Sequence, residues 1–218
     1  MNPPFAFPHR LYPIVDTLGD PKLSHVRLAE AMLEGGVRFL QLRLKGQPTR
    51  SFVEVARAVK ALTERQAAQL IINDRADIAK LVDAAGVHLG QDDLPAAAAR
   101  EILGSSKIIG LSTHNVAQAE AAARAGSADY IGFGPISTTR SKERPDPVQG
   151  LDGLRLVCRR VHLPVVAIGG ITATTMPAVL AAGADAVAMI GDIVRAADVK
   201  AKARDLLGLS RVQQKRGS

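Results

Sequence analysis

The stretch Ala167-Ile-Gly-Gly-Ile-Thr172 closes a short apolar run and opens a helical-looking one. Its two glycines lack Cβ atoms, so the backbone amides of this turn can approach a ligand, and Thr172 or Thr174 is predicted to cap the helix that follows. A second apolar strand, 185–190, is broken by Gly191 in the same way. Two such strand–glycine–helix units near a chain end are typical of the phosphate site of a (β/α)8 barrel, although the glycines would also serve simple tight turns.

The rest of the chain repeats the alternation of a short apolar strand and an amphipathic helix. Glycines before strands, as in Glu34-Gly-Gly-Val, Ala85-Gly-Val-His, Ala125-Gly-Ser-Ala-Asp and Ala182-Gly-Ala-Asp, indicate a reused helix-to-strand turn. An open doubly wound sheet is less favoured because no Gly-x-Gly-x-x-Gly follows the first strand. We predict an α/β protein with a single-domain (β/α)8 TIM barrel at 11–208, an irregular N-terminal arm at 1–10 and a basic flexible tail at 209–218.

The apolar runs and amphipathic stretches predict the following elements. Strands are expected at 11–15, 37–43, 69–72, 86–89, 107–111, 129–133, 164–168 and 185–190. Helices are expected near 21–33, 49–66, 94–103, 116–125 and 151–161, and three others should end near 82, 182 and 207.

Composition limits the class of protein. The chain has 218 residues, 47% of them hydrophobic, which is enough for the core of one barrel-sized domain. No apolar run approaches the roughly 20 residues that cross a bilayer, and the proline-rich N-terminus does not resemble a signal peptide. We therefore expect a soluble cytoplasmic protein without a membrane partner. The single cysteine, Cys158, lies in an amphipathic helical stretch and is expected to be a packed thiol rather than a nucleophile.

The positive charge of the chain raises the question of nucleic acid. The formal net charge is +7, and part of the excess lies in the tail 211–218. Aromatic residues, which stack on bases, make up only 3% of the chain. Small anionic substrates explain the basic surplus equally well, so no nucleic-acid partner is expected. The oligomeric state stays open, and a homo-oligomer is compatible with the sequence.

In a TIM barrel the chemistry lies at the C-terminal ends of the strands, and the second strand ends in two cations. Strand alternation places Gln41, Arg43 and Lys45 on one side and Leu42 and Leu44 on the other. A guanidinium and an ammonium that point into a barrel mouth suit a diphosphate. The alternative is that both cations form ion pairs along the rim.

Carboxylates end the next two strands. Asp74 follows the third strand, and Asp92 and Asp93 follow the fourth. One or two carboxylates together with substrate phosphate oxygens form a usual Mg²⁺ site, so Asp74 with Asp92 or Asp93 is the predicted pair. The alternative for the latter two is helix N-capping. His88 and Gln91 either orient these groups and touch substrate, or His88 is a buried, hydrogen-bonded histidine.

The fifth and sixth strands lead into hydroxyl-rich segments. Ser112 lies at the tip of the fifth strand and is expected to face the mouth, while Thr113 or Asn115 is expected to cap the next helix. The connection 134–147 is long and rich in hydroxyls and cations. Such a connection is uncommon in a compact barrel unless it is a lid or binding loop, and a disordered surface insertion is the alternative.

Five sequence motifs occur in the same order and with the same spacing as in a known protein family. The series Gln41-Leu-Arg-Leu-Lys-Gly, Ile72-Asn-Asp-Arg, His88-Leu-Gly-Gln-Asp-Asp, Gly132-Phe-Gly-Pro-Ile-Ser and Val166-Ala-Ile-Gly-Gly-Ile-Thr resembles the thiamine-phosphate synthase family over about residues 11–207. The resemblance implies a (β/α)8 transferase that uses Mg²⁺. It would join 4-amino-2-methyl-5-hydroxymethylpyrimidine diphosphate to 4-methyl-5-(2-phosphooxyethyl)thiazole, giving thiamine phosphate and diphosphate.

The resemblance also implies residue roles, in three groups. The metal would be held by Asp74 and Asp93, which chooses Asp93 over Asp92. Ser112 would lie near the diphosphate, and with Arg43, Lys45 and Lys142 it forms the predicted catalytic set. The pyrimidine diphosphate would be held by Gln41, Arg43, Lys45, Asn73 and Lys142, and the thiazole phosphate by Thr139, Ser141, Gly170, Ile190 and Gly191.

The sequence departs from the family pattern at a few positions. Leu44 stands where an acidic residue is common, Ser137-Thr138 replaces an aromatic-proline pair, Ser141 replaces a threonine, and Gly191 replaces a serine. Two other functions therefore stay open: an isomerase like the related thiazole tautomerase, and a non-catalytic phosphate-binding barrel. The diphosphate and metal residues argue against the isomerase. The chain shows no convincing Ser-His-Asp or Cys-His arrangement, and a dissociative substitution assisted by Mg²⁺ needs no protein nucleophile.

Overall fold

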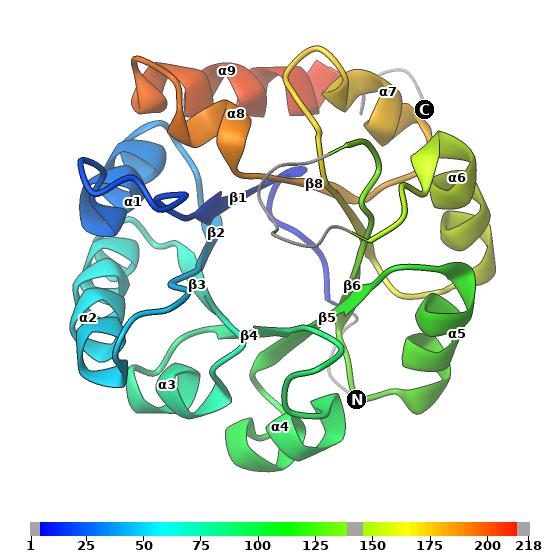
Figure 1. Cartoon of the computed structure of the whole chain (residues 1–218), viewed down its shortest axis with the longest axis horizontal. Coiled ribbons are helices and arrows are strands. Elements are labelled where there is room, and N and C mark those ends of the chain that lie inside the picture. Colours follow the sequence, from blue (N-terminus) through cyan, green and yellow to red (C-terminus); the bar gives the residue numbers. More distant parts are fainter. Residues whose placement is uncertain (1–4, 139–145, 213–218) are drawn as a thin grey trace.

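The computed structural model of the chain describes residues 5–138 and 146–212. Within these residues, eight strands form a closed barrel in sequential order with helices around the outside (Figure 1), which confirms the predicted TIM barrel. The strands are β1 (Leu11–Val15), β2 (Phe39–Leu42), β3 (Gln69–Asn73), β4 (Gly86–Leu89), β5 (Ile108–Thr113), β6 (Tyr130–Phe133), β7 (Val165–Ile168) and β8 (Ala186–Met189). The helices are α1 (His25–Glu34), α2 (Thr49–Arg65), α3 (Ala76–Leu81), α4 (Ala96–Leu103), α5 (Val116–Ala125), α6 (Gly150–Arg160), α7 (Met176–Ala181), α8 (Gly191–Val194) and α9 (Val199–Val212).

All neighbouring strands are parallel, and β1 closes the barrel by pairing with β8. In the register of β1, Ile14 lies opposite Gln41 of β2, and Tyr12 lies opposite Ala188 of β8. Because every strand runs the same way, all eight C-terminal ends meet at one rim. The predicted site residues that end the strands are therefore brought to the same side of the molecule.

The strands separate two apolar layers. The larger layer lies between the strands and the helices and includes Leu42 and Leu44, whereas a smaller cluster inside the barrel includes Ile14, Phe39 and Ile71. Gln41 is 2% exposed and belongs to the interior side. The structure thus confirms the predicted alternation along β2.

A repeated aspartate fixes the start of two strand pairs. The Asp129 backbone N–H donates to the Ile109 carbonyl at 2.7 Å, and the Asp129 carboxylate accepts from the Ile109 N–H at 2.7 Å. Asp185 makes the same two bonds to Val165, at 2.9 Å and 2.8 Å. In both places the aspartate precedes one strand and satisfies an N–H at the start of the strand before it. This gives a physical basis for the Ala-Asp repeat in the sequence.

The helix-stopping glycines are confirmed in three of the four predicted turns. Gly36, Gly126 and Gly183 have left-handed φ values of 102°, 66° and 110° after α1, α5 and α7. The fourth prediction is wrong, because α3 ends at Leu81 and Gly86 is the first residue of β4. A Cβ at Gly86 would lie 2.0 Å from the Ile108 carbonyl oxygen, so this glycine is needed for close strand packing.

Two predicted helix starts differ from the structure. The first helix begins at His25 rather than near residue 21, because Ser24 caps α1 by accepting from the Arg27 N–H. The helix after Gly170 begins at Met176, and Thr175 occupies the N-cap position without a side-chain cap bond. The prediction that Thr172 or Thr174 caps this helix is therefore wrong. Thr172 instead forms a turn in which its N–H donates to the Thr175 hydroxyl at 2.9 Å.

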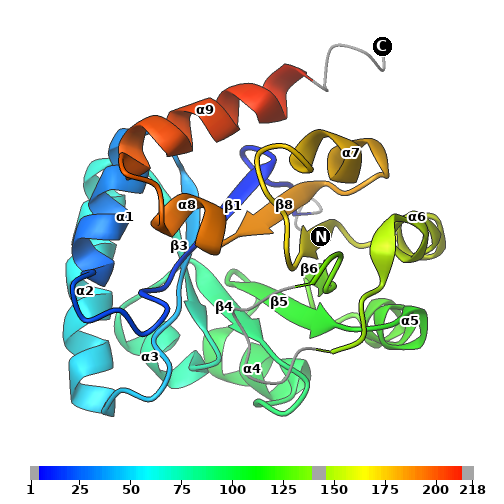
Figure 2. The ribbon, with the colours of Figure 1, turned by 45° about the horizontal axis from the view of Figure 1, so that its top comes forward.

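The last helix continues beyond the predicted end. α9 reaches Val212 and packs on α1, α7 and α8 (Figure 2), so residues 209–212 are helical and not part of a flexible tail. The reason is burial: Ser210 is 2% exposed and its hydroxyl donates to the Leu207 carbonyl at 2.8 Å. The remaining tail residues, 213–218, lie outside the described residues. None of the helices in the described ranges combines the length and apolar character that crossing a bilayer requires.

The described part of the N-terminal arm, residues 5–10, is irregular but packs against the barrel. It crosses the far end of the barrel in Figure 1, where Phe7 contacts the rings of Tyr12, Phe39 and Tyr130 at centroid distances of 6.0, 5.3 and 5.2 Å. Phe5 joins the same cluster, 4.7 Å from the Phe7 ring. The arm therefore closes the N-terminal end of the barrel, opposite the rim that carries the predicted site.

We expect Phe7→Ala to lower the free energy of unfolding by about 2–3 kcal/mol, because it removes a ring from an aromatic cluster that is only partly exposed. Urea unfolding followed by circular dichroism measures this loss. Leu81→Ala is the control: Leu81 is 57% exposed, and its truncation should change stability by no more than about 0.5 kcal/mol. Equal losses in the two variants would contradict the closing role of the arm.

Candidate active site at the C-terminal rim of the barrel

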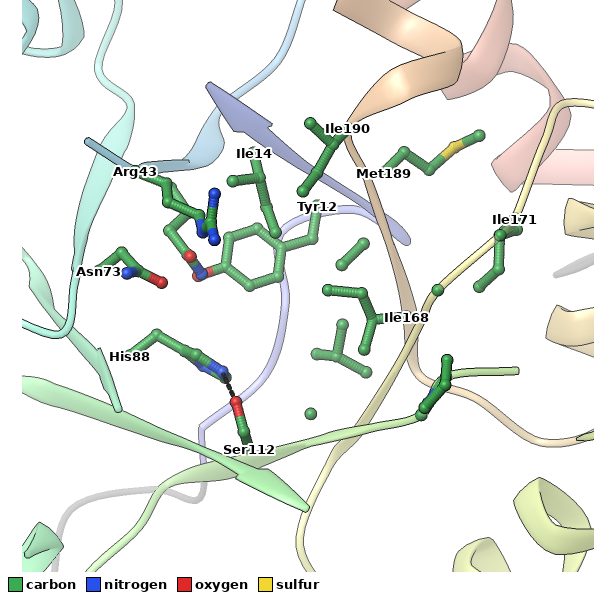
Figure 3. Close-up of a pocket in the computed structure, with 18 of the residues that line it drawn as sticks. Tyr12, Ile14, Arg43, Asn73, His88, Ser112, Ile168, Ile171, Met189 and Ile190 are labelled. Carbon is green, nitrogen blue, oxygen red and sulfur yellow. Dashed lines mark hydrogen bonds between the residues drawn. The ribbon is translucent and has the colours of Figure 1, made fainter. Parts of the chain in front are cut away.

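A cavity of about 1150 Å³ opens at the C-terminal rim and is lined by side chains or backbone from all eight strands. Figure 3 shows Arg43, Asn73 and His88 on one side of it, with Ile168 and Ile190 on the other. The cavity is larger than the few hundred Å³ that one small ligand needs. It therefore has room for two small molecules side by side.

The two predicted cations lie on this rim as expected and each has an acidic partner. Arg43 forms an ion pair with Asp16, and Lys45 forms one with Asp74. Arg43, Lys45 and Asp74 line the cavity, whereas Asp16 does not. Both sequence-based alternatives are thus present at once, because the cations are paired along the rim and also face the cavity. Asp16 was missed, although its position directly after β1 is a signal that could have found it.

The carboxylates meet beside Lys45. Asp74 has a left-handed φ of 63°. Burial, and next the neighbouring Asp93 carboxylate, raise the pKa of Asp74 above its ordinary value, with Lys45 acting in the opposite direction. Asp93 Oδ2 accepts from the Gly90 N–H at 2.6 Å. Two neighbouring carboxylates repel each other, and a cation bound between them would remove this repulsion. Asp74 and Asp93 are therefore suitable ligands for a cation.

Neither Asp92 nor Asp93 caps a helix. α4 begins at Ala96 with Pro95 in the N-cap position, so the capping alternative is excluded. Asp93 is partly buried and turned toward Asp74, whereas Asp92 is exposed at the cavity edge. No group of three or more His, Cys, Asp or Glu side chains with metal-binding geometry occurs in residues 5–138 and 146–212. The protein donors available at this place are therefore the two carboxylates.

A chain of hydrogen bonds crosses the barrel interior below these charges. Gln41 Nε2 donates to the Tyr12 hydroxyl at 2.9 Å, and the Tyr12 and Tyr130 hydroxyls are 2.9 Å apart. Tyr130 reaches His88 Nδ1 at 3.0 Å, and His88 Nε2 lies 3.0 Å from the Ser112 hydroxyl, the contact drawn in Figure 3. The chain links five strands, β1, β2, β4, β5 and β6.

One arrangement of protons gives every group in this chain a partner. Gln41 Nε2 donates to the Tyr12 oxygen, and Tyr12 can then donate to Tyr130 and Tyr130 to His88 Nδ1. Desolvation in the barrel lowers the pKa of His88 to about 4, so the ring is neutral. In this arrangement its proton is on Nε2 and is shared with the Ser112 hydroxyl.

Glycines make room for this polar chain. A Cβ at Gly110 of β5 would lie 2.2 Å from Tyr130 Cζ and 2.4 Å from His88 Nδ1. Burial raises the pKa values of Tyr12 and Tyr130 well above the ordinary value, so both hydroxyls keep their protons. Of the alternatives for His88, the structure therefore shows the hydrogen-bonded histidine, although its ring also lines the cavity.

The opposite side of the cavity carries the Gly169-Gly170 turn. Both glycines have left-handed φ values, 99° and 67°. They also allow the segment after β6 to pack closely, because a Cβ at Gly169 would lie 2.5 Å from Pro135 Cβ and one at Gly170 would lie 2.5 Å from the Thr138 carbonyl oxygen. Gly170, Ile190 and Gly191, the predicted ligands of the thiazole phosphate, all line the cavity. The turn thus serves packing and leaves backbone exposed to the cavity at the same time.

The other predicted residues are placed as follows. Asn73 ends β3 and Ser112 lies near the end of β5, and both line the cavity. Asn115 caps α5 by accepting from the Gln118 N–H at 2.9 Å, whereas Thr113 is buried in β5 and donates to the Gly132 carbonyl. Thr139, Ser141 and Lys142 lie outside the described residues.

Cys158 lies on α6 and is not part of the cavity lining. Burial raises the pKa of its thiol to about 11, so it is protonated at neutral pH and is a poor nucleophile. This agrees with the packed thiol expected from the sequence.

Comparisons with known proteins give one consistent result. The family described as thiamine monophosphate synthase matches residues 11–193. The thiamine-phosphate synthase of Chloroflexus aurantiacus is 44% identical over 207 residues, which cover 95% of each chain, and that of Pelotomaculum thermopropionicum is 46% identical over 184 residues, or 84% of each chain. The solved structure of a thiamine phosphate pyrophosphorylase from Pyrococcus furiosus superposes with a TM-score of 0.84 at 36% identity, over 94% of this chain and 96% of that one.

We expect Tyr130→Phe to lower the free energy of unfolding by about 1–3 kcal/mol, because it removes the acceptor of Tyr12 and the donor to His88 while it keeps the ring. Thermal and urea unfolding measure this change. Unchanged stability would mean that the hydrogen-bond chain does not stabilise the barrel interior.

His88 should make stability depend on pH. Its pKa is lowered from 6.5 to about 4 in the folded protein, so the unfolded chain takes up the proton first as the pH falls. The contribution is fully present above pH 6.5 and is lost toward pH 4, which predicts a loss of about 2 kcal/mol between pH 7 and pH 5. The pH dependence of unfolding in His88→Asn should be weaker by this amount. An identical dependence in both proteins would contradict the assignment.

Proposed function

The chain belongs to the thiamine monophosphate synthase family, and we propose that it forms thiamine phosphate by joining 4-amino-2-methyl-5-hydroxymethylpyrimidine diphosphate to 4-methyl-5-(2-phosphooxyethyl)thiazole, with diphosphate as the second product. The observation that supports this most strongly is the division of a single rim cavity into two different halves. The half at β2–β4 carries the cations and carboxylates of the strand ends, and the half at β7–β8 carries the glycines that follow these two strands, with charged side chains beyond them. Each half suits one phosphorylated substrate.

The pyrimidine diphosphate is assigned to the half at β2–β4. Arg43 and Lys45 offer a forked guanidinium and a point charge to a diphosphate. The Gln41 side chain is oriented by its bond to Tyr12, which leaves its carbonyl oxygen available to an amino group of the pyrimidine. Asn73 adds a second amide at 9% exposure on the same wall. Lys142, outside the described residues, keeps its predicted role at the diphosphate.

The donor set beside this half fits Mg²⁺. Asp74 and Asp93 are the two carboxylates, and burial, followed by the neighbouring Asp93 carboxylate, raises the pKa of Asp74. Mg²⁺ usually takes one or two carboxylates and completes its shell with water and substrate phosphate oxygens. When bound, the ion supplies positive charge that stabilises the departing diphosphate.

The thiazole phosphate is assigned to the half at β7–β8. Gly170, Ile190 and Gly191 expose backbone on the cavity wall, and backbone N–H groups are common phosphate ligands. Thr139 and Ser141, outside the described residues, keep their predicted roles at this phosphate. Ile168 and Ile190 supply an apolar surface on this side of the cavity, against which the thiazole ring would pack (Figure 3).

The reaction then needs position and charge rather than a protein nucleophile. Arg43 and Lys45 stabilise the negative charge that builds on the diphosphate as its bond to the pyrimidine methylene carbon breaks. Ser112, which lines the cavity, donates its hydroxyl hydrogen to the same leaving group. The thiazole nitrogen, held from the opposite half, forms the new bond to that carbon. Catalysis therefore rests on the alignment of the two substrates.

The departure at Leu44 has a structural explanation. Leu44 is 8% exposed and packs in the layer between strands and helices, away from the cavity. Its side chain therefore contributes to the core and does not line the cavity. The departure at Gly191 does lie on the cavity wall, and its consequence is a question of substrate binding.

The direct test incubates the purified protein with both precursors and Mg²⁺ and follows thiamine phosphate by oxidation to its fluorescent thiochrome. We expect product only when both precursors are present, with one diphosphate released for each thiamine phosphate formed. Conversion of the thiazole compound alone would indicate an isomerase. Binding of both precursors without product would indicate a non-catalytic barrel.

The metal assignment predicts different effects for neighbouring aspartates. Asp74→Asn and Asp93→Asn should each lower turnover at limiting Mg²⁺ by about 100-fold or more, because each removes one of two charged ligands. Asp92→Asn is the control, since Asp92 is exposed and does not face Asp74. A Mg²⁺ titration of turnover in the three variants checks this. Similar losses in all three would mean that the pair has been assigned wrongly.

A further inference from the structure

The charged side chains that line the cavity differ in one respect. Arg43 is paired with Asp16, Lys45 with Asp74, and Lys202 with Asp192 at 2.8 Å. Arg195 also lines the cavity. Its backbone N–H donates to the Gly191 carbonyl at 3.3 Å, but no hydrogen bond or ion pair joins its guanidinium to a side chain or carbonyl within 5–138 or 146–212. Its guanidinium is thus a cation at the cavity wall whose charge is not compensated by the described part of the chain.

Arg195 is placed next to Gly191 by the short helix α8. It follows the last residue of α8, and a Cβ built at Gly191 would lie 3.5 Å from Arg195 Nη1. Gly191 does not have a left-handed φ, so the backbone itself does not require glycine there. Because Gly191 has no side chain, the space beside the Arg195 guanidinium is not filled. Ile190, labelled in Figure 3, marks where this wall joins the cavity.

The nearest acidic residue in sequence, Asp192, has partners other than Arg195. Asp192 Oδ2 accepts from the Ala173 N–H at 3.0 Å and pairs with Lys202 on α9. These two contacts tie the loop after β7 to α8 and α9. They also neutralise the Asp192 carboxylate, so an anion that enters this corner meets the Arg195 charge without a competing carboxylate.

We propose that Arg195 binds the phosphate of the thiazole substrate and selects the phosphorylated thiazole over its alcohol. The proposal rests on the proposed function and adds a side-chain cation to a half of the cavity to which no cation had been assigned. A guanidinium offers two parallel N–H donors to phosphate oxygens, and such charge-assisted contacts are lost when the phosphate is absent. Discrimination between the two thiazoles follows from this difference.

The same geometry explains why a glycine at 191 is compatible with phosphate binding. The family resemblance places a serine there, and its hydroxyl is absent in this chain. A guanidinium 3.5 Å from the Cβ position occupies the same corner and can donate to the same phosphate. Arg195 and a serine at 191 are therefore interchangeable donors, which gives the proposal a second, independent test.

The first test replaces the charge. In Arg195→Gln the KM for 4-methyl-5-(2-phosphooxyethyl)thiazole should rise about 10- to 100-fold, the usual effect of losing a charged hydrogen bond. The KM for the pyrimidine diphosphate and the turnover with the thiazole alcohol should stay unchanged. Arg204→Gln is the matched control: Arg204 is an exposed arginine on α9 outside the cavity lining, and its loss changes the net charge equally. Equal KM values in wild type and Arg195→Gln, or equal rises in the two variants, would overturn the proposal.

The second test restores the donor. Gly191→Ser in the Arg195→Gln background should recover at least part of the lost affinity for the phosphorylated thiazole, since a Cβ at 191 meets no atom closer than 3.5 Å. No recovery in a folded double variant would contradict the interchange.

Calorimetric titration with the phosphorylated thiazole separates this proposal from the proposed function. If the wild type forms no product, the proposed function fails. Weaker binding in Arg195→Gln would then still support the phosphate contact, and equal binding would refute it.

Discussion

The closure of eight parallel strands is the constraint on which the rest of this structure depends. Each strand satisfies its backbone hydrogen bonds on both sides, and β1 pairs with β8, so the sheet has no free edge. Because the strands all run the same way, every loop that follows a strand opens on the same rim. Residues as distant in sequence as Arg43 and Gly191 therefore line one cavity. The proposed reaction needs a single shared cavity, because the reacting atoms of two phosphorylated substrates must be brought into contact.

Closure also creates an interior that must be filled. The N-terminal half of the barrel holds an apolar and aromatic cluster with Phe39 and Tyr130 at its centre, closed from outside by Phe7. Above it, the Tyr12–Tyr130–His88 chain provides a polar layer in which each donor has an acceptor. Through these hydrogen bonds, side chains in the barrel interior hold Ser112 in place at the rim. A rigid floor of this kind is what positional catalysis requires.

Much of the fold could be predicted from local patterns. The eight strands follow from short apolar runs, and the rim set of Gln41, Arg43 and Lys45 follows from strand alternation, because both depend only on nearby residues. The cross-barrel contacts could not be predicted in this way. Tyr12 and Tyr130 are 118 residues apart, and their hydroxyls meet only because the closed register brings β1 and β6 together across the interior.

The errors and omissions at the site have the same origin. Asp16 and Arg195 carry ordinary charged side chains, and only their neighbours in space distinguish them from surface charges. The aspartates 92 and 93 fit a helix cap in sequence, but the helix begins at Ala96, which leaves both to the cavity. Family resemblance selected Asp93, and the structure supplies a physical reason in its position beside Asp74.

The central claim is that one rim holds two separate anion subsites, with the diphosphate at β2–β4 and the thiazole phosphate at β7–β8. The most direct measurement titrates the protein calorimetrically with inorganic diphosphate and Mg²⁺, then titrates the saturated complex with 4-methyl-5-(2-phosphooxyethyl)thiazole. The account predicts that one equivalent of each ligand binds and that the thiazole phosphate does not displace the bound diphosphate. Competition between the two ligands for a single site would contradict it.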